Sequence, residues 1–331
     1  MKKRILTGDR PTGNLHLGHL VGSLQNRVAL QEEYDTFILI ADVQALTTHF
    51  EQPEKITENV YAVALDNLSV GLNPEKASLF VQSMVPTIAE LTVFYSMLVS
   101  VNTLRHNPTI KTEAANYGYE DMTYGFLGYP VSQTADITFC NANLVPVGED
   151  QLPHMELTKK IVRRFNDLYK TNVLTEPEAM LSACPRLVGL DGNAKMGKSL
   201  NNAIFLCDTE EMVKAKILSA KTDPQRINVK DKGHPDVCSA FSYHKIFNPD
   251  ECENICESCK QAQVGCVDCK NNLFKKVNAL LKPIRQKREY YEAHPNLVRE
   301  ILVAGTEKAN TIGQETVAKV KEAMKINHFG G

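Results

Sequence analysis

The stretch KRILTGDRPTGNLHLGHLVGSLQNRV, residues 3–28, places a short apolar segment, a Gly/Pro loop and an amphipathic helix in one continuous run. Residues 3–7 have the length and composition of a short buried strand, and the loop follows them directly. Beyond the loop, the apolar side chains fall on one face of a helix: Leu17, Leu20, Val21, Leu24 and Val28. A strand that leads through a loop into a helix predicts the beginning of an α/β fold.

Further apolar segments of strand length follow at 36–42, 78–83 and 143–148. They alternate with helical patterns at 54–71, 86–100 and 151–167. Continuous apolar strands that alternate with helices are typical of a parallel sheet covered on both faces. We therefore predict a Rossmann-type, doubly wound α/β fold with its ligands at the carboxyl ends of the strands.

The pattern changes towards the C-terminus. From 208 to 328 the sequence is amphipathic, rich in Lys and without a convincing strand. Because 331 residues exceed the usual size of a single hydrophobic core, two domains are expected. We predict a Rossmann domain over 1–200 and an all-helical domain over 201–331, whose last helix packs back on the first domain.

Composition narrows the class of protein. Apolar residues make up 43% and charged residues 23%, as in ordinary soluble enzymes. With a net charge of −2, binding of a nucleic acid would need a local basic patch. No apolar stretch approaches the roughly 20 residues that span a bilayer, and no signal peptide fits the N-terminus. We therefore expect a cytosolic protein that does not enter a membrane.

Two histidines three residues apart, His16 and His19, stand where the first helix begins. At such a position the backbone N–H groups and the helix dipole favour an anion, and both side chains can donate hydrogen bonds to phosphate oxygens. Gly18 lacks a side chain, so a flat ring can approach the backbone closely. The motif favours nucleotide binding, while two surface histidines or a metal site are the alternatives.

A second basic motif, GNAKMGKSLNN, covers residues 192–202. It is not a P-loop, because the GxxxxGK[ST] spacing is missing. Lys195 and Lys198 on a Gly- and Asn-rich loop suit the clamping of a triphosphate whose charge develops in the transition state. Taken alone, such a segment is more commonly a solvated basic loop.

Polar side chains share one face of a helix expected around 120–140. Tyr129, Gln133 and Asp136 are spaced i, i+4 and i+7. A partly buried carboxylate at Asp136 needs a hydrogen-bond donor, which an indole N–H or a phenol O–H of an aromatic ligand would supply. A helix cap or a surface aspartate is the alternative interpretation.

Together these motifs resemble the class I aminoacyl-tRNA synthetases. HLGH at 16–19 stands where that class has HIGH, and KMGKS at 195–199 where it has KMSKS, with Gly197 in place of the usual Ser. The segments 8–22, 144–166 and 302–324 resemble the tryptophanyl-tRNA synthetases. The Tyr-x-x-x-Gln-x-x-Asp pattern is reminiscent of their sister enzymes, the tyrosyl-tRNA synthetases, which are the alternative. The resemblance covers nearly the whole chain.

The resemblance implies a role for each matching residue. Contacts with ATP are implied for Arg10, Pro11, Thr12, Gly18, His19, Gly148, Glu149, Asp150, Lys195, Met196, Gly197, Lys198 and Ser199. The catalytic residues implied, which meet the triphosphate together with Mg²⁺, are His19, Lys111, Lys195 and Lys198. Asp136 would accept the indole N–H of tryptophan, with the rest of the pocket formed by Tyr129, Gln133, Leu6, Val145 and Val147.

The implied reaction has two steps. The carboxylate of L-tryptophan attacks the α-phosphate of ATP and pyrophosphate leaves. The adenylate then passes its acyl group to the terminal ribose of tRNA(Trp). The resemblance also implies a homodimer.

Six of the nine cysteines fall close together in the expected helical domain. Cys238, Cys259, Cys266 and Cys269 supply four thiolates, which either zinc or an iron–sulfur cluster accepts. The spacing of the last three resembles a subgroup of bacterial tryptophanyl-tRNA synthetases that carry a [4Fe–4S] cluster, although the gap to Cys238 differs slightly. We expect that cluster, with zinc or no metal as alternatives. The part played by Cys252 and Cys256 stays open.

Two other classes of protein fit less well. Small nucleotidylyltransferases share the fold and the HxGH motif but lack a long helical domain and the second lysine loop. A synthetase paralogue kept for RNA binding or amino-acid sensing would not need the intact HLGH motif, the lysine pair and Asp136 together.

Overall fold

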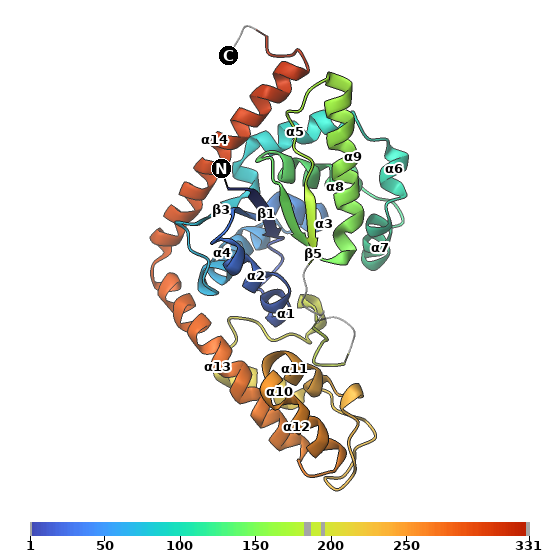
Figure 1. Ribbon diagram of the computed structural model, residues 1–331, viewed down its shortest axis with the longest axis vertical. Helices are drawn as coiled ribbons and strands as arrows, with labels where there is room; N and C mark the ends of the chain where they lie inside the picture. The colour runs from blue at the N-terminus through green and yellow to red at the C-terminus, as the bar shows by residue number, and fades with distance from the viewer. Residues whose placement is uncertain (1, 182–186, 193–195, 329–331) are drawn as a thin grey trace.

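Five parallel strands form one sheet in the computed structural model, which describes residues 2–181, 187–192 and 196–328 (Figure 1). The strands are β1 (Arg4–Asp9), β2 (Asp35–Ile40), β3 (Ala77–Val81), β4 (Leu144–Val147) and β5 (Glu178–Leu181). Their order is β3-β2-β1-β4-β5, and each neighbouring pair is parallel. The predicted doubly wound sheet is confirmed. Its switch point lies between β1 and β4, where folds of this kind bind ligands.

Helices cover both faces of the sheet. In chain order they are α1 (Leu17–His19), α2 (Gln25–Leu30), α3 (Asp42–His49), α4 (Pro53–Ser69), α5 (Pro86–Ser96), α6 (Val101–Arg105), α7 (Pro108–Tyr117), α8 (Tyr124–Thr138) and α9 (Leu152–Tyr169). A π-helical turn, Leu20–Leu24, joins α1 to α2, so the predicted first helix is a continuous helical run. The helix expected over 86–100 ends early, because Ser100 caps α6 by accepting the backbone N–H of Thr103 at 3.2 Å.

Alternate side chains of β2 divide the interior into two hydrophobic cores. Phe37 and Leu39 point into one core, together with side chains from α5, α8 and α9. Ile38 and Ile40 point into the other, with side chains from α1 and α4. This alternation is the period-two pattern of a strand buried on both faces, which explains why the strand is continuously apolar in sequence.

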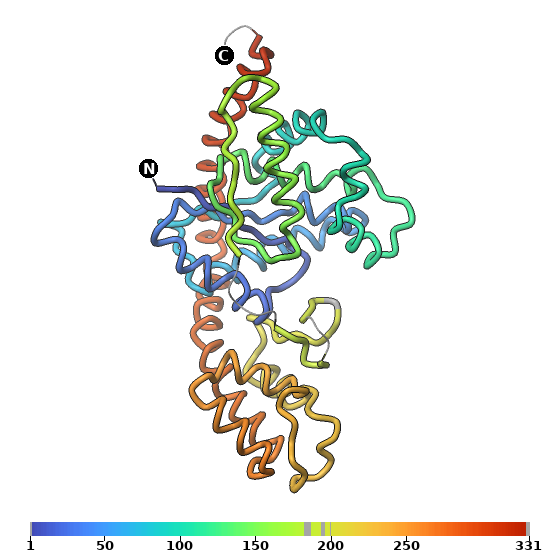
Figure 2. Tube along the Cα trace, turned by 45° about the vertical axis from the view of Figure 1, so that its right-hand side comes forward, coloured from blue at the N-terminus to red at the C-terminus, as the bar shows by residue number. Residues whose placement is uncertain are grey.

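Every regular element from residue 210 to residue 323 is a helix. The α-helices here are α10 (Glu210–Ser219), α11 (Ser239–Phe247), α12 (Pro249–Lys260), α13 (Cys266–Ala293) and α14 (Pro295–Ala323). Figures 1 and 2 show α10, α11 and α12 gathered at one end of an elongated molecule, with α13 and α14 running along one side towards the sheet. The second core continues from the sheet through α4 into α10, α11 and α13, so hydrophobic packing crosses residue 200. The domain boundary at 200 stays a prediction.

The last helix, α14, packs against strand β3. A Cβ atom on Gly305 would lie 2.1 Å from the carbonyl oxygen of Leu79, so only glycine allows this approach of helix to strand. A Cβ atom on Gly313 would likewise lie 2.3 Å from Oγ1 of Thr87. Two glycines thus allow α14 to pack closely against the part of the molecule that contains the sheet.

Among the described residues, no helix combines the length and the apolar composition needed to cross a membrane.

Candidate active site

A cavity of about 290 Å³ opens at the carboxyl ends of β1 and β4, at the switch point of the sheet. Its walls come from the strand ends, from α8 and from the beginning of α3. The predicted site residues that line it are Leu6, Arg10, Tyr129, Gln133, Asp136, Val145, Val147 and Gly148. Apolar side chains in this lining alternate with polar and charged ones, which suits a small molecule that combines an apolar ring with polar groups.

Asp136 is a buried carboxylate in this cavity, with 2% of its surface exposed. Its Oδ1 accepts a hydrogen bond of 2.7 Å from Nε2 of Gln82, and Oε1 of Gln82 accepts the backbone N–H of Gln44 at 3.0 Å. The first residues of α3 thereby orient the Gln82 amide, which in turn holds the carboxylate. Burial raises the pKa of Asp136 to about 7, although the Gln82 hydrogen bond opposes the rise.

Tyr129 is oriented by a chain of hydrogen bonds that begins at the N-cap of α7. Oδ1 of Asn107 accepts the backbone N–H groups of Thr109 and Ile110, which turns its Nδ2 towards Nδ1 of His154, 3.5 Å away. Because Nδ1 accepts there, the imidazole proton lies on Nε2, which donates to the Tyr129 hydroxyl at 2.8 Å. Burial lowers the pKa of His154 to about 4. The neutral imidazole leaves the phenol proton available to another acceptor.

His19 is held as a neutral donor. Its Nδ1 accepts the backbone N–H of His16 at 3.2 Å, so its proton lies on Nε2. Burial, followed by the neighbouring His16, lowers the pKa of His19 to about 3. The two rings lie with centroids 3.9 Å apart. His19 can therefore donate from Nε2 to an anion without carrying a charge itself.

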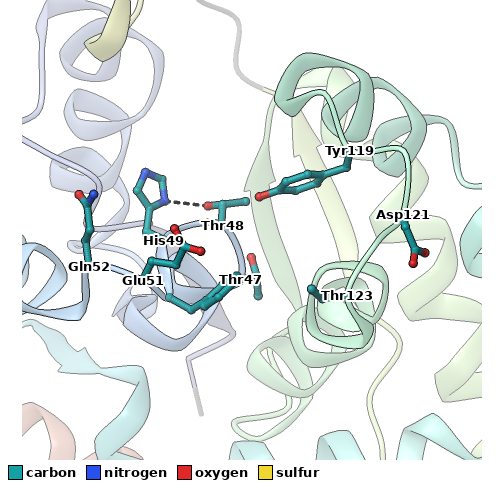
Figure 3. Close-up of a pocket in the computed structure, with 9 residues that line it drawn as sticks. Thr47, Thr48, His49, Glu51, Gln52, Tyr119, Asp121 and Thr123 are labelled. Atoms are coloured by element: carbon teal, nitrogen blue, oxygen red, sulfur yellow. Dashed lines mark hydrogen bonds between the residues drawn. The ribbon is translucent and has the colours of Figure 1, made fainter.

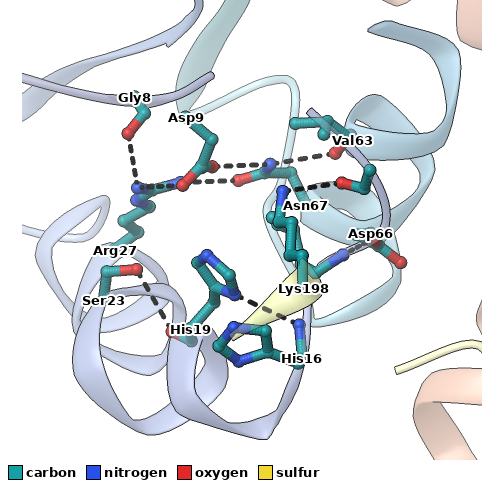
Figure 4. Close-up of polar contacts among 12 residues, drawn as sticks. Gly8, Asp9, His16, His19, Ser23, Arg27, Val63, Asp66, Asn67 and Lys198 are labelled. Carbon is teal, nitrogen blue, oxygen red and sulfur yellow. Dashed lines mark hydrogen bonds and ion pairs between the residues drawn. The ribbon is translucent and has the colours of Figure 1, made fainter. Parts of the chain in front are cut away.

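The described part of the KMGKS motif lies against the HLGH loop (Figure 4). Nζ of Lys198 donates a hydrogen bond of 2.7 Å to the carbonyl oxygen of Gly13. A Cβ atom on Gly18 would stand 3.8 Å from Sδ of Met196. Burial lowers the pKa of Lys198, and the charges of Asp9 and Asp66 oppose that effect. The fold thus brings the second lysine of the motif to the loop that precedes the first helix.

A buried ion pair fixes the end of β1 in the same region. Nη2 of Arg27 donates to Oδ1 of Asp9 at 3.1 Å and to the carbonyl oxygen of Gly8 at 3.1 Å, and Asn67 also contacts the pair (Figure 4). Burial alone would raise the pKa of Asp9, but the Arg27 guanidinium lowers it to about 2. A permanent negative charge therefore faces the cavity beside Lys198.

A second buried ion pair connects this loop to the C-terminal half. Asp66 of α4 accepts the backbone N–H of Leu15 at 2.8 Å through Oδ2 and pairs with Arg288 of α13 through Oδ1. Burial raises the pKa of Asp66 to about 6, and Arg288 limits the rise. The residue before His16 is thus tied to a helix more than two hundred residues later in the chain.

Known proteins share this arrangement. The family described as tRNA synthetases class I (W and Y) matches residues 1–282. The chain belongs to this family of class I tRNA synthetases.

Individual relatives cover the whole length of this class I synthetase. It is 49% identical over 338 residues to the tryptophan–tRNA ligase of Streptococcus mutans and 48% identical over 338 residues to that of Lactococcus lactis, with 99% of each chain covered. The solved tryptophanyl-tRNA synthetase of Campylobacter jejuni, complexed with ADP and tryptophan, is 31% identical with a TM-score of 0.87, covering 97% of this chain and 99% of that one. The tyrosyl-tRNA synthetase of Archaeoglobus fulgidus, 22% identical with a TM-score of 0.67 over 86% of this chain and 90% of that one, shares the fold.

Other predicted site residues of the synthetase lie outside the cavity lining. Lys111 is on α7 with its side chain exposed, and Glu149 and Asp150 form an exposed 3₁₀ turn after β4. Pro11 and Thr12 belong to the loop after β1. Lys195 and the side chain of Ser199 lie outside the described residues, and the backbone N–H of Gly197 donates to Oδ1 of Asn202 at 2.9 Å. The nucleotide roles of these residues stay predictions.

Several polar residues at the cavity were not predicted. Gln82, which holds Asp136, follows β3 directly, and a polar side chain at the carboxyl end of an apolar strand was a signal that could have found it. Gln151 and Glu113 line the cavity, from the turn before α9 and from α7. Neither stands in a pattern of its own, so their approach to the cavity depends on tertiary packing.

A second cavity, of about 320 Å³, lies between the end of α3 and the segment that leads into α8 (Figure 3). Thr48 and His49 are joined there by a hydrogen bond of 2.8 Å, and Tyr119 points across towards them. None of the residues predicted to bind ATP or the amino acid lines it.

The four predicted cysteine ligands lie near one another in the helical half. Cys238 precedes α11, Cys259 is on α12, and Cys266 and Cys269 are on the first turn of α13. Burial, and then the nearby thiols of the other three, raise the pKa of Cys269 to about 12. Among the described residues, no three His, Cys, Asp or Glu side chains stand close enough to hold one metal ion.

Proposed function

We propose that this class I synthetase activates L-tryptophan with ATP and transfers the tryptophanyl group to tRNA(Trp). The observation that carries the proposal is Asp136, a buried acceptor at the wall of an aromatic-sized cavity. The identity of 49% to a tryptophan–tRNA ligase over the full length supports the same activity.

Asp136 favours an amino acid whose ring carries a hydrogen-bond donor, because Gln82 satisfies only one of its carboxylate oxygens. An indole N–H or a phenol O–H supplies such a donor, and the 49% identity to a tryptophan–tRNA ligase supports tryptophan. Sites built in this way reject ligands without the donor by factors on the order of 10⁴–10⁵. Leu6, Val145 and Val147 surround the ring.

The first step needs charge stabilisation more than it needs covalent catalysis. The tryptophan carboxylate attacks the α-phosphate, and the leaving pyrophosphate gathers negative charge. Neutral His19 donates from Nε2 to a phosphate oxygen. Lys198 contributes a positive charge beside the same loop, together with the predicted partners Lys195 and Lys111. Mg²⁺, when bound with ATP, would neutralise further phosphate charge.

The test is ATP–pyrophosphate exchange with tryptophan and tyrosine in parallel. We expect exchange with tryptophan only. Exchange with tyrosine only would overturn the amino-acid assignment, and exchange with neither would favour a paralogue without synthetase activity.

We further propose that Cys238, Cys259, Cys266 and Cys269 hold a [4Fe–4S] cluster. Cys238, Cys259 and Cys266 all lie near enough to Cys269 to act on its pKa, and a four-iron cluster takes one thiolate on each of its irons. Burial raises the pKa of the Cys259 thiol, and Nη1 of Arg226, which donates to Sγ of Cys259 at 3.7 Å, opposes that rise.

Iron and sulfide analysis of protein purified without oxygen tests this second proposal. We expect visible absorbance with iron and sulfide in equal amounts. A colourless protein loaded with zinc would overturn it.

We also propose a homodimer located in the cytosol. Val93 of α5, Met97 directly after α5 and Val101 of α6 are all more than half exposed. Exposed apolar side chains of this kind are typical of a surface that a second copy covers.

A further inference from the structure

Helix α12 carries two cysteines besides the one that belongs to the proposed cluster ligands. Cys252 and Cys256 are four residues apart, and both are half-buried. Side chains at this spacing lie on one face of a helix, with their Cβ atoms about 5–6 Å apart. The two thiols are therefore neighbours, and each is partly open to solvent.

The thiol of Cys252 has few neighbours that act on it. Burial raises its pKa, Lys245 of α11 opposes that rise, and Cys256 adds to it. No carboxylate or imidazole of the described residues is among these neighbours. Cys269, in contrast, is surrounded by the other three proposed cluster ligands. Cys252 and Cys256 thus form a pair of their own.

A lysine stands beside each thiol of the pair. Lys245 acts on Cys252 from the neighbouring helix. Lys260, one turn after Cys256 on the same helix, interacts with that thiol and with Glu257. Ammonium groups beside both thiols offset the negative charge that the sulfurs gain when they lose their protons.

The spacing of the pair favours a bridging ion over a disulfide. A disulfide brings its Cβ atoms to about 3.5–4.5 Å, which is closer than one turn of a helix allows. A single ion bound to both sulfurs spans the wider gap. Thiolates select soft metal ions, and Zn²⁺ would need further ligands to reach its usual four. Cu⁺ is satisfied by two thiolates.

We propose that Cys252 and Cys256 form a two-thiolate site for a soft monovalent metal ion of the Cu⁺ class. On binding, each thiol releases its proton, both sulfurs bond to the ion, and the metal keeps its oxidation state. The occupied site carries a net negative charge, because two thiolates outweigh one Cu⁺, and Lys245 and Lys260 offset that charge. The inference is independent of the proposed synthetase activity and of the proposed iron–sulfur cluster.

The test is a titration of the full chain, purified without oxygen, with Cu⁺ held by the coloured chelator bicinchoninate. Loss of the chelate colour measures copper uptake, and iron is measured before and after. The variants are Cys252→Ser and Cys256→Ser. Cys207→Ser is the matched control, because Cys207 is also half-buried but lies beside Arg288 and Asp66 instead of a second cysteine.

We expect each serine variant to take up one Cu⁺ fewer than the unmodified chain, with C207S unchanged and the iron content constant. Because the readout is a difference between chains, copper bound at the four proposed cluster ligands does not affect it. Uptake by C252S and C256S equal to that of the unmodified chain would overturn the proposal. Release of iron in step with copper uptake would also overturn it, since the copper would then occupy the cluster ligands.

A further variant separates the geometry of the pair from the number of thiols. C256S/E257C keeps the thiol count but moves the second thiol five residues from Cys252, away from the shared face of α12. Glu257 is exposed, so the change spares the fold. We expect this variant to lose the same one Cu⁺ as C256S. Full uptake by C256S/E257C would contradict the proposal, because it would show that the spacing does not matter.

Discussion

Asp9 and Asp136 line the same cavity, and their neighbours separate their pKa values by several units. The Arg27 guanidinium keeps Asp9 ionised, whereas burial brings the pKa of Asp136 to about 7. One carboxylate therefore supplies a fixed charge near the nucleotide loop. Asp136, in contrast, is buried at a cost to stability, and a ligand that donates a hydrogen bond to it would offset that cost.

Replacement of Asp136 by Asn should separate binding from stability. The folded-state pKa of about 7 lies above the ordinary aspartate value of 3.8, so ionised Asp136 destabilises the fold increasingly as pH rises between those values. We expect D136N to raise Tm by more at pH 8 than at pH 5. In exchange assays kcat/KM for tryptophan should fall ten- to a hundredfold, as expected from loss of a hydrogen bond to a charged group. An equal change in Tm at both pH values would contradict this account.

Replacement of His19 by Ala should lower the rate and spare the fold. His19 donates from a neutral ring at the phosphate end of the site, and loss of such a donor typically costs about 10²–10³ in kcat. We expect kcat for exchange to fall in that range while Tm changes little. His16 is more deeply buried and packs against Phe205, so H16A should lower Tm more than H19A does. A drop in Tm for H19A as large as for H16A would return His19 to a structural role.

At the scale of elements, the ion pair between α4 and α13 links the two halves of the chain. Arg288 and Asp66 are both nearly buried, and Asp66 also holds the backbone of Leu15 in the signature loop. Movement of α13 would therefore act on the loop that carries His16 and His19. The connection gives a physical route between the helical half and the nucleotide site.

Replacement of Arg288 by Met should destabilise the fold and loosen the nucleotide loop. Removing one partner leaves a buried carboxylate, at a typical cost of about 3–5 kcal/mol. The pKa of Asp66 is already raised to about 6, and loss of Arg288 should raise it further, so the loss of stability should be larger at pH 8 than at pH 5. We expect a lower Tm and a raised KM for ATP. The double variant D66N/R288M should recover most of the Tm; no recovery would show that Arg288 stabilises through other contacts.

Elements with a strong local pattern could be predicted from the sequence. The first four strands could be found by their apolar centres, and β2 shows the reason, since Phe37 and Ile38 are buried in different cores on its two faces. Strand β5 was missed, because EAML is short, lies at the sheet edge and has exposed ends. The break between α5 and α6 was also missed, since it depends on the cap at Ser100.

Only those cavity residues that belong to a sequence motif could be predicted. Asp136 and Tyr129 were found because their spacing places them on one face of a helix, and Arg10 because it lies in the loop before the HLGH motif. Glu113 and Gln82 reach the cavity because α7 and the end of β3 pack beside it. Glu113 carries no signal of its own, since long-range packing is not encoded in local spacing, whereas Gln82 could have been found as a polar side chain at the carboxyl end of an apolar strand.

At the scale of the whole molecule, the proposed dimer would meet at the exposed apolar residues Val93, Met97 and Val101. Replacement of Met97 by Glu puts a charge among these residues, where Met97 is 67% exposed. We expect the unmodified chain to be a dimer by light scattering and M97E to be a monomer, because a charge buried at an apolar interface is costly. The control is the same substitution at another exposed methionine, Met212→Glu on α10, and this variant should stay dimeric. A dimeric M97E would place the interface elsewhere.

The contact between α14 and β3 can form only late in translation. Leu79 leaves the ribosome long before Gly305, so strand β3 stays uncovered while most of the chain is being synthesised. Any product that stops early, by a nonsense codon or a broken message, keeps that flank exposed and is open to proteolysis. Only a chain translated through Gly305 can therefore cover this side of its sheet with α14.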